Sequence, residues 1–169
     1  MGAVAFAYSL DDDVRDHFGG PLLPEGEELD MHDGGDAAPA ILALGGTWLA
    51  SALSDNDDGK REAGMMFEAA AFSSVAAYAL KEIAGRERPF ASADRSSFGE
   101  NGDSFPSMHV TAAFAIGTVL AESGNDRTRW LRRVLGYGLA GATAYARMDH
   151  DVHWFSDTVG ASLLGYGIG

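Results

Sequence analysis

The residues best suited to chemistry lie in the last quarter of the chain, between two apolar segments that contain glycine. His153 and Asp157 are four residues apart, so a helix beginning near His153 would place both side chains on one face. A carboxylate held against one imidazole nitrogen fixes the tautomer and makes the other nitrogen a better nucleophile or base. Arg147, just upstream, adds a permanent cation suited to binding a phosphate oxygen. Taken alone, this segment predicts either phosphate chemistry or a surface ion pair beside an ordinary histidine.

Two upstream segments carry similar residues at the ends of predicted helices. Lys81 lies near the end of one helix and Arg88-Pro89 lies just beyond it. A lysine at that position is often only a partner for the helix dipole, but Lys81 is one of just two lysines in the chain. In the second segment, Pro106-Ser107-Met108-His109, a proline and a serine in a first helical turn leave backbone N–H groups free to bind an anion. The alternative for this second segment is an ordinary capped helix with a solvent-facing histidine.

The elements that must position these segments are predicted to be helices. Apolar residues recur at helical spacing over most of the chain, and no stretch shows the sustained alternation of a strand. Start and stop signals bound the predicted helices at 38–53, 61–84, 106–121, 128–146 and from 153 onward. The sequence therefore predicts an all-α protein, built as a helical bundle.

The chain length of 169 residues suits one domain with a substantial core. Residues 1–36 are acidic and interrupted by glycine and proline, which predicts an irregular N-terminal arm. The catalytic core is predicted to cover about 38–169, and the loop 90–104 is a candidate lid. Residues 1–10 lack the basic start and the apolar centre of a secretory signal.

Charge and hydropathy limit the possible partners. The net charge of −13 repels nucleic acids and anionic lipid surfaces, so we predict no nucleic-acid partner. Uncharged runs such as 134–146 reach only ~20 Å at ~1.5 Å per residue, against the ~30 Å of a bilayer core. We therefore expect short apolar helices that pack on one another in a soluble protein.

Together, the three segments resemble one family, the type 2 phosphatidic acid phosphatases. These share a helical core with bacterial class A acid phosphatases and vanadium-dependent haloperoxidases. The family signature reads K-x6-R-P, then P-S-G-H, then S-R-x5-H-x3-D, and this chain matches its order and spacing over roughly residues 69–165. Two positions differ: Met108 stands where the family usually has glycine, and Ala146 where it usually has serine. Because Met108 keeps its backbone N–H, we expect an altered substrate preference rather than an inactive protein.

The resemblance implies a role for each matching residue. His153 would attack phosphorus and become a phosphohistidine, and Asp157 would orient it. His109 would protonate the leaving group and later activate the water that hydrolyses the intermediate. The groups that would bind the phosphate are the side chains of Lys81, Arg88, Ser107 and Arg147 and the backbone N–H of Met108.

The resemblance also implies the reaction and its setting. It implies a phosphatase for phosphate monoesters, acting on a phosphorylated small molecule or a lipid phosphate, with vanadate as an inhibitor. No metal or other cofactor is predicted, since three cationic side chains neutralise the developing charge. The implied location is periplasmic or otherwise extracytoplasmic, either soluble or membrane-associated.

Three alternatives remain open at this point. Asp149, His150, Asp151 and His153 have the donor atoms of a metal site, and a hydrolase could use one. A vanadate-dependent haloperoxidase would use the same pocket for a different reaction. A non-catalytic homologue that only binds phosphate is the third alternative, and Met108 is the residue that favours it.

Overall fold

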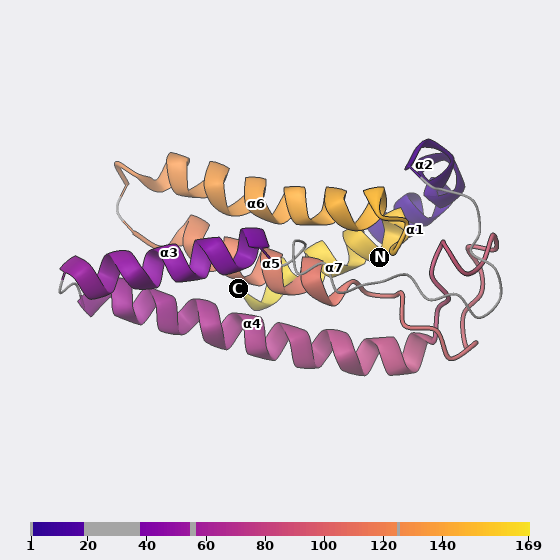
Figure 1. Cartoon of the computed structure of the whole chain (residues 1–169), viewed down its shortest axis with the longest axis horizontal. Coiled ribbons are helices and arrows are strands. Elements are labelled where there is room, and N and C mark those ends of the chain that lie inside the picture. The colour runs from indigo at the N-terminus through magenta and orange to yellow at the C-terminus, as the bar shows by residue number, and fades with distance from the viewer. Residues whose placement is uncertain (1, 19–37, 55–56, 125) are drawn as a thin grey trace.

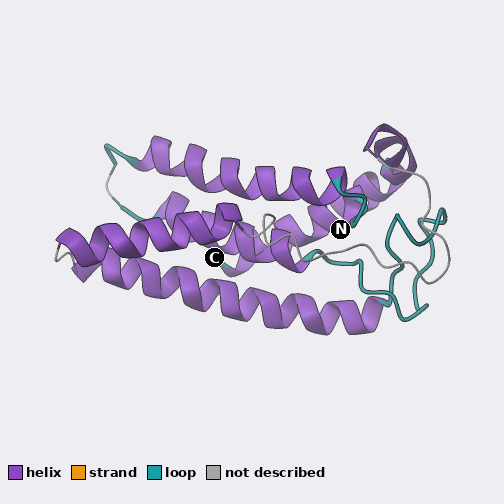
Figure 2. Ribbon diagram, viewed as in Figure 1, coloured by secondary structure: helices purple, strands orange, loops and turns teal. Residues whose placement is uncertain are grey.

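The computed structural model describes residues 2–18, 38–54, 57–124 and 126–169. Within these ranges it contains helices and no strand (Figures 1 and 2), which confirms the all-α prediction. The helices are α1 (Gly2–Ser9), α2 (Asp11–Phe18), α3 (Ala38–Ser54), α4 (Asp57–Ala84), α5 (Met108–Glu122), α6 (Arg129–Asp149) and α7 (Phe155–Ile168).

Helix α5 is the centre of the bundle. It packs against α4, α6 and α7, and most of its residues from Val110 to Ala121 are buried. Its buried side chains are small or aliphatic, so neighbouring helices approach it on several sides. The main apolar cluster joins α4 to α5 and consists of Met66, Ala69, Ala115, Ile116, Val119 and Leu120.

Helices α5 and α6 touch backbone to backbone at two glycines. A Cβ atom added at Gly117 of α5 would lie 2.6 Å from the carbonyl oxygen of Gly136 on α6. No real Cβ contact is that short, so any larger residue would push the two helices apart. Glycine is required here by the closeness of the neighbouring helix.

Replacing Gly117 with alanine is therefore expected to lower the free energy of unfolding by about 1–3 kcal/mol, the usual cost of overpacking a tight core. Gly138→Ala is the matched control, because nothing lies within 4 Å of a Cβ at Gly138 and alanine favours a helix. Thermal or denaturant unfolding of both variants makes the comparison. Equal stability of Gly117→Ala and wild type would contradict the tight contact.

The N-terminal arm is only partly described, and the described part is not irregular. Residues 2–9 and 11–18 form α1 and α2, so the prediction of an irregular arm is wrong there. The glycines and prolines that favoured it lie in 19–37, outside the described residues. Asp11, Asp12 and Asp13 form the first turn of α2, where negative charge stabilises the positive end of the helix dipole. Helix α1 packs against α7.

Two predicted helix starts shift in ways that matter for the site. Helix α5 begins at Met108 with Ser107 as its N-cap, so Pro106 precedes the helix and does not occupy its first turn. Helix α7 begins at Phe155, so His153 also lies before its helix. His153 therefore precedes the helix while Asp157 lies in its first turn. The two residues do not lie on one helical face.

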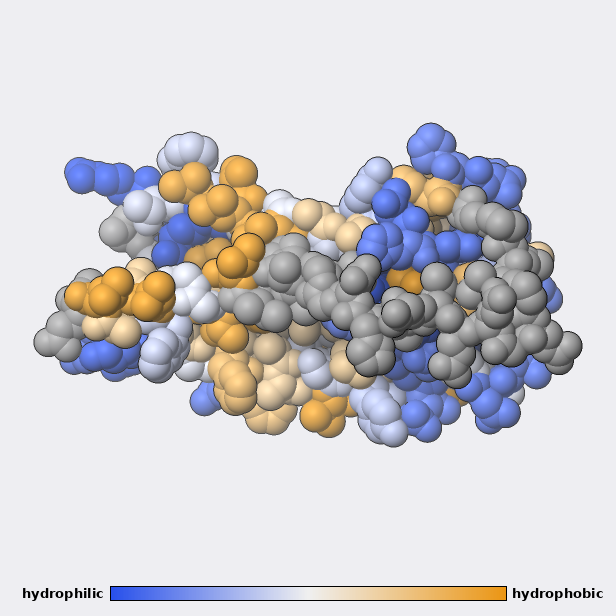
Figure 3. Space-filling view, in the orientation of Figure 1, coloured by the Kyte–Doolittle hydropathy of each residue, from blue (hydrophilic) through white to orange (hydrophobic). Residues whose placement is uncertain are grey.

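Much of the bundle surface is apolar. In Figure 3, hydrophobic side chains gather over the middle of the bundle, and hydrophilic ones over the end that carries the loop after α4. Among the described helices, α4 is long and apolar enough to cross a membrane. Large exposed apolar side chains include Leu42, Trp48, Leu49 and Leu53 of α3, Phe67, Phe72, Val75, Tyr78 and Ile83 of α4, and Trp130, Leu131, Val134 and Leu135 of α6.

Candidate active site

The loop between α4 and α5 brings together the three segments singled out in the sequence. These contain Lys81 and Arg88, Ser107 to His109, and Arg147 to Asp157. Within the loop, the Ser104 N–H donates to the carbonyl of Arg86 (2.8 Å), which folds the second segment back onto the first. The indole Nε1 of Trp154 donates to the carbonyl of Glu87 (2.9 Å). This bond ties the turn before α7 to the same loop, so all three segments meet at one end of the bundle.

Asp157 is the residue on which these segments converge. Its Oδ2 atom accepts hydrogen bonds from the backbone N–H of Trp154 (2.9 Å) and from the hydroxyl of Ser104. The bond to Trp154 closes the first turn of α7 in the manner of a capping box. The same oxygen lies 3.6 Å from Nδ1 of His153. The carboxylate is fully buried and therefore has a fixed orientation toward the imidazole.

His153 is held as a neutral imidazole. Burial lowers its pKa to about 3, and the charges of Lys81 and Arg88 act in the same direction, while Asp157 opposes them. With Nδ1 facing a carboxylate, we assign the proton to Nδ1, which leaves the lone pair on Nε2. A neutral imidazole with a free Nε2 is the form that can attack phosphorus.

The cations of the first segment are close together and already engaged by a carboxylate. Arg88 donates from Nε and Nη2 to the two carboxylate oxygens of Asp103, each at 2.7 Å. Lys81 Nζ donates to the backbone carbonyl of Asp103 and lies 3.9 Å from its carboxylate. Partial burial opposes ionisation of Asp103, but hydrogen bonding to Arg88 and the charges of Arg88 and Lys81 hold its pKa below the usual value. The Asp103 carboxylate therefore occupies Lys81 and Arg88, the two cations that the sequence predicts to bind phosphate.

Asp103→Asn is expected to strengthen phosphate binding, because an amide competes less well than a carboxylate for Arg88. The Asp103 side chain is 62% exposed, and exposed ion pairs contribute up to ~1 kcal/mol, so the inhibition constant of inorganic phosphate should fall up to about fivefold. This constant is measured from the inhibition of phosphate-ester hydrolysis by added inorganic phosphate. Glu100→Gln, in the same loop, is the control. A weaker inhibition by phosphate in Asp103→Asn would instead show that Asp103 positions Arg88.

The second segment presents donors at the start of α5. The Ser107 hydroxyl is buried and has no hydrogen-bond partner. Met108 is the first helical residue, so its N–H is among those with no partner inside the helix. His109 is exposed, and the positive charges of Lys81 and Arg88 lie within electrostatic reach of it. This end of α5 can therefore offer two donors and a histidine to one bound anion.

Arg147 lies on the last turn of α6 and is buried, with 5% of its surface exposed. Its carbonyl accepts a hydrogen bond from Val152 (3.2 Å), which holds the turn that leads to His153. Its predicted contact with phosphate stays a prediction. Across the described ranges, no three His, Asp or Glu side chains gather as a metal site would require, so the alternative site at Asp149, His150, Asp151 and His153 gains no support.

Sequence reasoning missed four residues that hold the site. Asp103 and Ser104 lie in the predicted lid, and nothing in their spacing indicates contact with Arg88 or Asp157. Arg86 occupies a position that the first signature segment leaves unspecified, so the signature assigns it no role. Asp11 is 145 residues from its partner Ser156, and no local pattern reveals a contact of that range.

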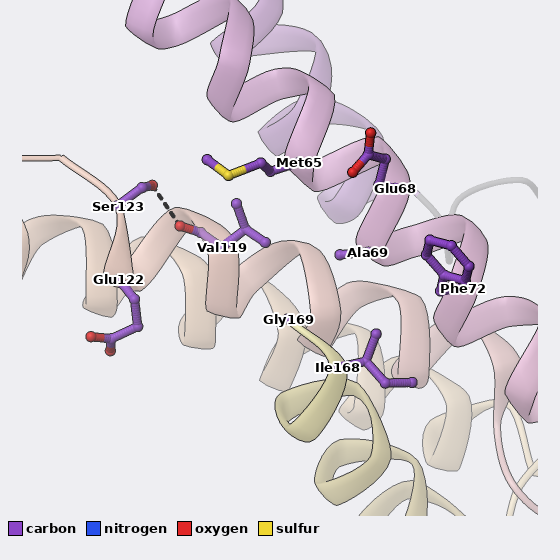
Figure 4. A pocket seen from close by; sticks show the side chains of 9 residues that line it. All are labelled: Met65, Glu68, Ala69, Phe72, Val119, Glu122, Ser123, Ile168 and Gly169. Atoms are coloured by element: carbon purple, nitrogen blue, oxygen red, sulfur yellow. Dashed lines mark hydrogen bonds between the residues drawn. The ribbon is translucent and has the colours of Figure 1, made fainter.

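The bundle also has a groove away from these residues. It has a volume of about 500 Å³ and lies between α4, α5 and the end of α7 (Figure 4). Met65, Phe72 and Ile168 give it an apolar lining, and Glu68 and Glu122 lie at its edges. None of the predicted site residues lines it, and we assign it no part in the reaction.

Comparison with known proteins places every predicted site residue inside one matched region. The model of the PAP2 superfamily matches residues 63–169. The lipid A 1-phosphatase of Porphyromonas gingivalis is 32% identical over 71 residues, which make up 42% of this chain and 16% of that protein. The chain thus spans only a small part of this relative. No solved structure matches the chain.

Proposed function

Because the chain belongs to the PAP2 superfamily, we propose that it is a phosphatase that hydrolyses phosphate monoesters with His153 as the nucleophile. The observation that carries this proposal is the buried His153–Asp157 pair beside the cations Lys81 and Arg88. A neutral imidazole backed by a carboxylate supplies the nucleophile, and nearby cations favour an anionic substrate.

In the first step, Nε2 of His153 forms a bond to phosphorus while the bond from phosphorus to the ester oxygen breaks. His109 donates a proton to that oxygen, so the alcohol leaves neutral. The imidazole gains positive charge as it is phosphorylated, and the Asp157 carboxylate stabilises it. Lys81, Arg88 and Arg147 neutralise the charge that spreads over the phosphoryl oxygens. Asp103 must first release Arg88.

In the second step, water attacks the phosphohistidine from the side that the alcohol left. His109, now a base, takes a proton from this water. The bond between phosphorus and Nε2 breaks, inorganic phosphate leaves, and His153 returns to the neutral form. The overall reaction is ester plus water giving alcohol plus phosphate, with both histidines restored.

We further propose that the substrate is a lipid phosphate and that the protein lies in a membrane. The apolar faces of α3, α4 and α6 are exposed, with Phe72 at 70% and Ile83 at 80%. At ~1.5 Å per residue, α4 is about 42 Å long, enough to cross a bilayer. The exposed apolar faces and the length of α4 disfavour the expected soluble form.

The position of the site supports a lipid substrate. It lies at one end of the bundle, where a lipid head group would meet it, and the relative's name also concerns a lipid phosphate. The extracytoplasmic location stays a prediction.

The test uses protein expressed in bacteria and separated into soluble and membrane fractions. We expect the protein to stay in membranes after alkaline washing, and the detergent-purified form to release phosphate from both an aryl phosphate and dispersed lipid phosphates. Vanadate should inhibit this release, and EDTA should not. Soluble protein that prefers the aryl ester would overturn the lipid proposal, and strong inhibition by EDTA would revive the metal alternative. Halide oxidation with added vanadate and peroxide, without phosphate release, would favour a haloperoxidase.

A further inference from the structure

A fully buried arginine outside the signature residues lies behind the nucleophile pair. Arg86 Nη1 donates to Oδ1 of Asp157 (2.5 Å) and to the hydroxyl of Ser156 (2.8 Å). Its Nη2 donates to Oδ2 of Asp11 (2.7 Å). The guanidinium also lies over the rings of Phe98, Trp154 and Tyr8, with 4.8 Å to the nearest centroid. Its position is therefore fixed on every side.

The second carboxylate of this cluster comes from the N-terminal helix α2. Asp11 is fully buried and accepts hydrogen bonds from the backbone N–H and the hydroxyl of Ser156, both at 2.7 Å. Ser156 is the second residue of α7, so Asp11 accepts a backbone N–H at the start of that helix, where a negative charge also stabilises the helix dipole. Asp11, Arg86 and Asp157 thus form one chain of hydrogen bonds, and Oδ2 of Asp157 at its end lies 3.6 Å from Nδ1 of His153.

The charges of this cluster explain why two carboxylates are needed. Arg86 alone would cancel the charge of Asp157, and a neutral pair would stabilise a positively charged imidazole poorly. With Asp11 added, two negative charges face one positive charge, and a net charge of −1 remains. Because Arg86 holds Oδ1 of Asp157, the carboxylate keeps its other oxygen, Oδ2, turned toward His153.

We infer that Asp11 and Arg86 are positioning residues for the reaction, which fix the Asp157 carboxylate against His153 and preserve its net negative charge. This inference rests on the proposed role of His153 as the nucleophile. It makes the N-terminal helix α2 part of the catalytic apparatus, although it lies outside the region that the family model matches.

The test compares neighbouring carboxylates of one helix. Asp11→Asn keeps the shape of the side chain and removes its charge. Asp12→Asn is the matched control, because Asp12 pairs at the surface with Arg95 (3.0 Å). With an aryl phosphate as substrate, we expect Asp11→Asn to lower kcat about tenfold or more, to leave KM within about twofold, and to slow formation of the phosphoenzyme equally. Asp12→Asn should match wild type.

Two further variants keep the inference falsifiable if Asp11→Asn folds poorly. Ser156→Ala removes a hydroxyl bound to both Asp11 and Arg86 but leaves every charge in place, and we expect kcat to fall several-fold at unchanged KM. Asp11→Asn combined with Arg86→Gln restores the net charge of −1, and we expect a higher kcat than in Asp11→Asn alone, where the net charge is zero.

The outcomes separate this inference from the proposed function. If His153→Ala is inactive while Asp11→Asn and Ser156→Ala both retain the kcat of wild type, the positioning role is wrong and the nucleophile stands. Activity retained by His153→Ala would overturn the proposed function itself. A loss in Asp11→Asn that appears only in KM would also contradict the inference, because the cluster touches the nucleophile pair and not the phosphate.

Discussion

His153→Ala is expected to abolish phosphate release, with kcat at least ~10⁴-fold below wild type, because the substitution removes the proposed nucleophile. The residues proposed to bind phosphate remain, so the variant should still bind inorganic phosphate and vanadate. Rapid acid-free quenching of a reaction with a ³²P-labelled ester measures the intermediate directly. Wild type should carry an acid-labile, alkali-stable label, and His153→Ala should carry none.

His150→Ala is the matched control for this experiment. His150 lies three residues away, is exposed, and belongs to the alternative metal site. Full activity in His150→Ala, together with loss in His153→Ala, supports the histidine nucleophile. Equal losses in both variants would point instead to a shared ligand role. Since His153 is buried, its alanine variant must also keep the thermal unfolding midpoint near that of wild type for the comparison to stand.

The spacing of His153 and Asp157 correctly predicts that the two side chains lie close together, but the geometry that brings them together differs from the predicted one. Spacing of four residues indicates one helical face, whereas the pair meets because Asp157 folds back on the N-cap Trp154 while His153 lies just outside the helix. The signature segments predict which residues gather, since each lies at a helix end. They cannot predict Asp11 or Arg86, whose contacts depend on how α2 and the loop after α4 pack against α7.

The expectation of short apolar helices depended on counting uncharged runs instead of whole helices. The run 134–146 lies inside α6, which extends over 129–149 because Arg129, Arg132 and Arg133 continue the helix at one end and Arg147 at the other. Charged residues thus lie toward the ends of the helix, beyond its apolar centre. The exposure of the apolar side chains could not be predicted from the sequence either. An apolar stripe on a helix has the same period whether it faces the protein core or the surroundings.

Asp157→Asn is expected to lower kcat by about 10³-fold or more with KM nearly unchanged. The amide nitrogen of asparagine is a donor, and turned toward His153 it would favour the tautomer with the proton on Nε2. That nitrogen would then have no lone pair for phosphorus, an effect that costs about 10⁴-fold in the analogous serine-protease triad. Steady-state kinetics over a range of aryl phosphate concentrations separate kcat from KM, and Asp149→Asn on the exposed end of α6 is the control.

The fold should tolerate this substitution, which makes the kinetic effect interpretable. After Asp157→Asn, Arg86 still pairs with Asp11, so no buried charge is left without a partner, the situation that makes breaking a buried ion pair costly. If the amide nitrogen takes the place of Oδ2, the backbone N–H of Trp154 loses its acceptor. This loss is expected to lower the free energy of unfolding by about 1–3 kcal/mol. A kcat within tenfold of wild type would show that Asp157 serves the fold of α7 more than the nucleophile. A complete loss of folding would show that Asp11 alone cannot balance Arg86.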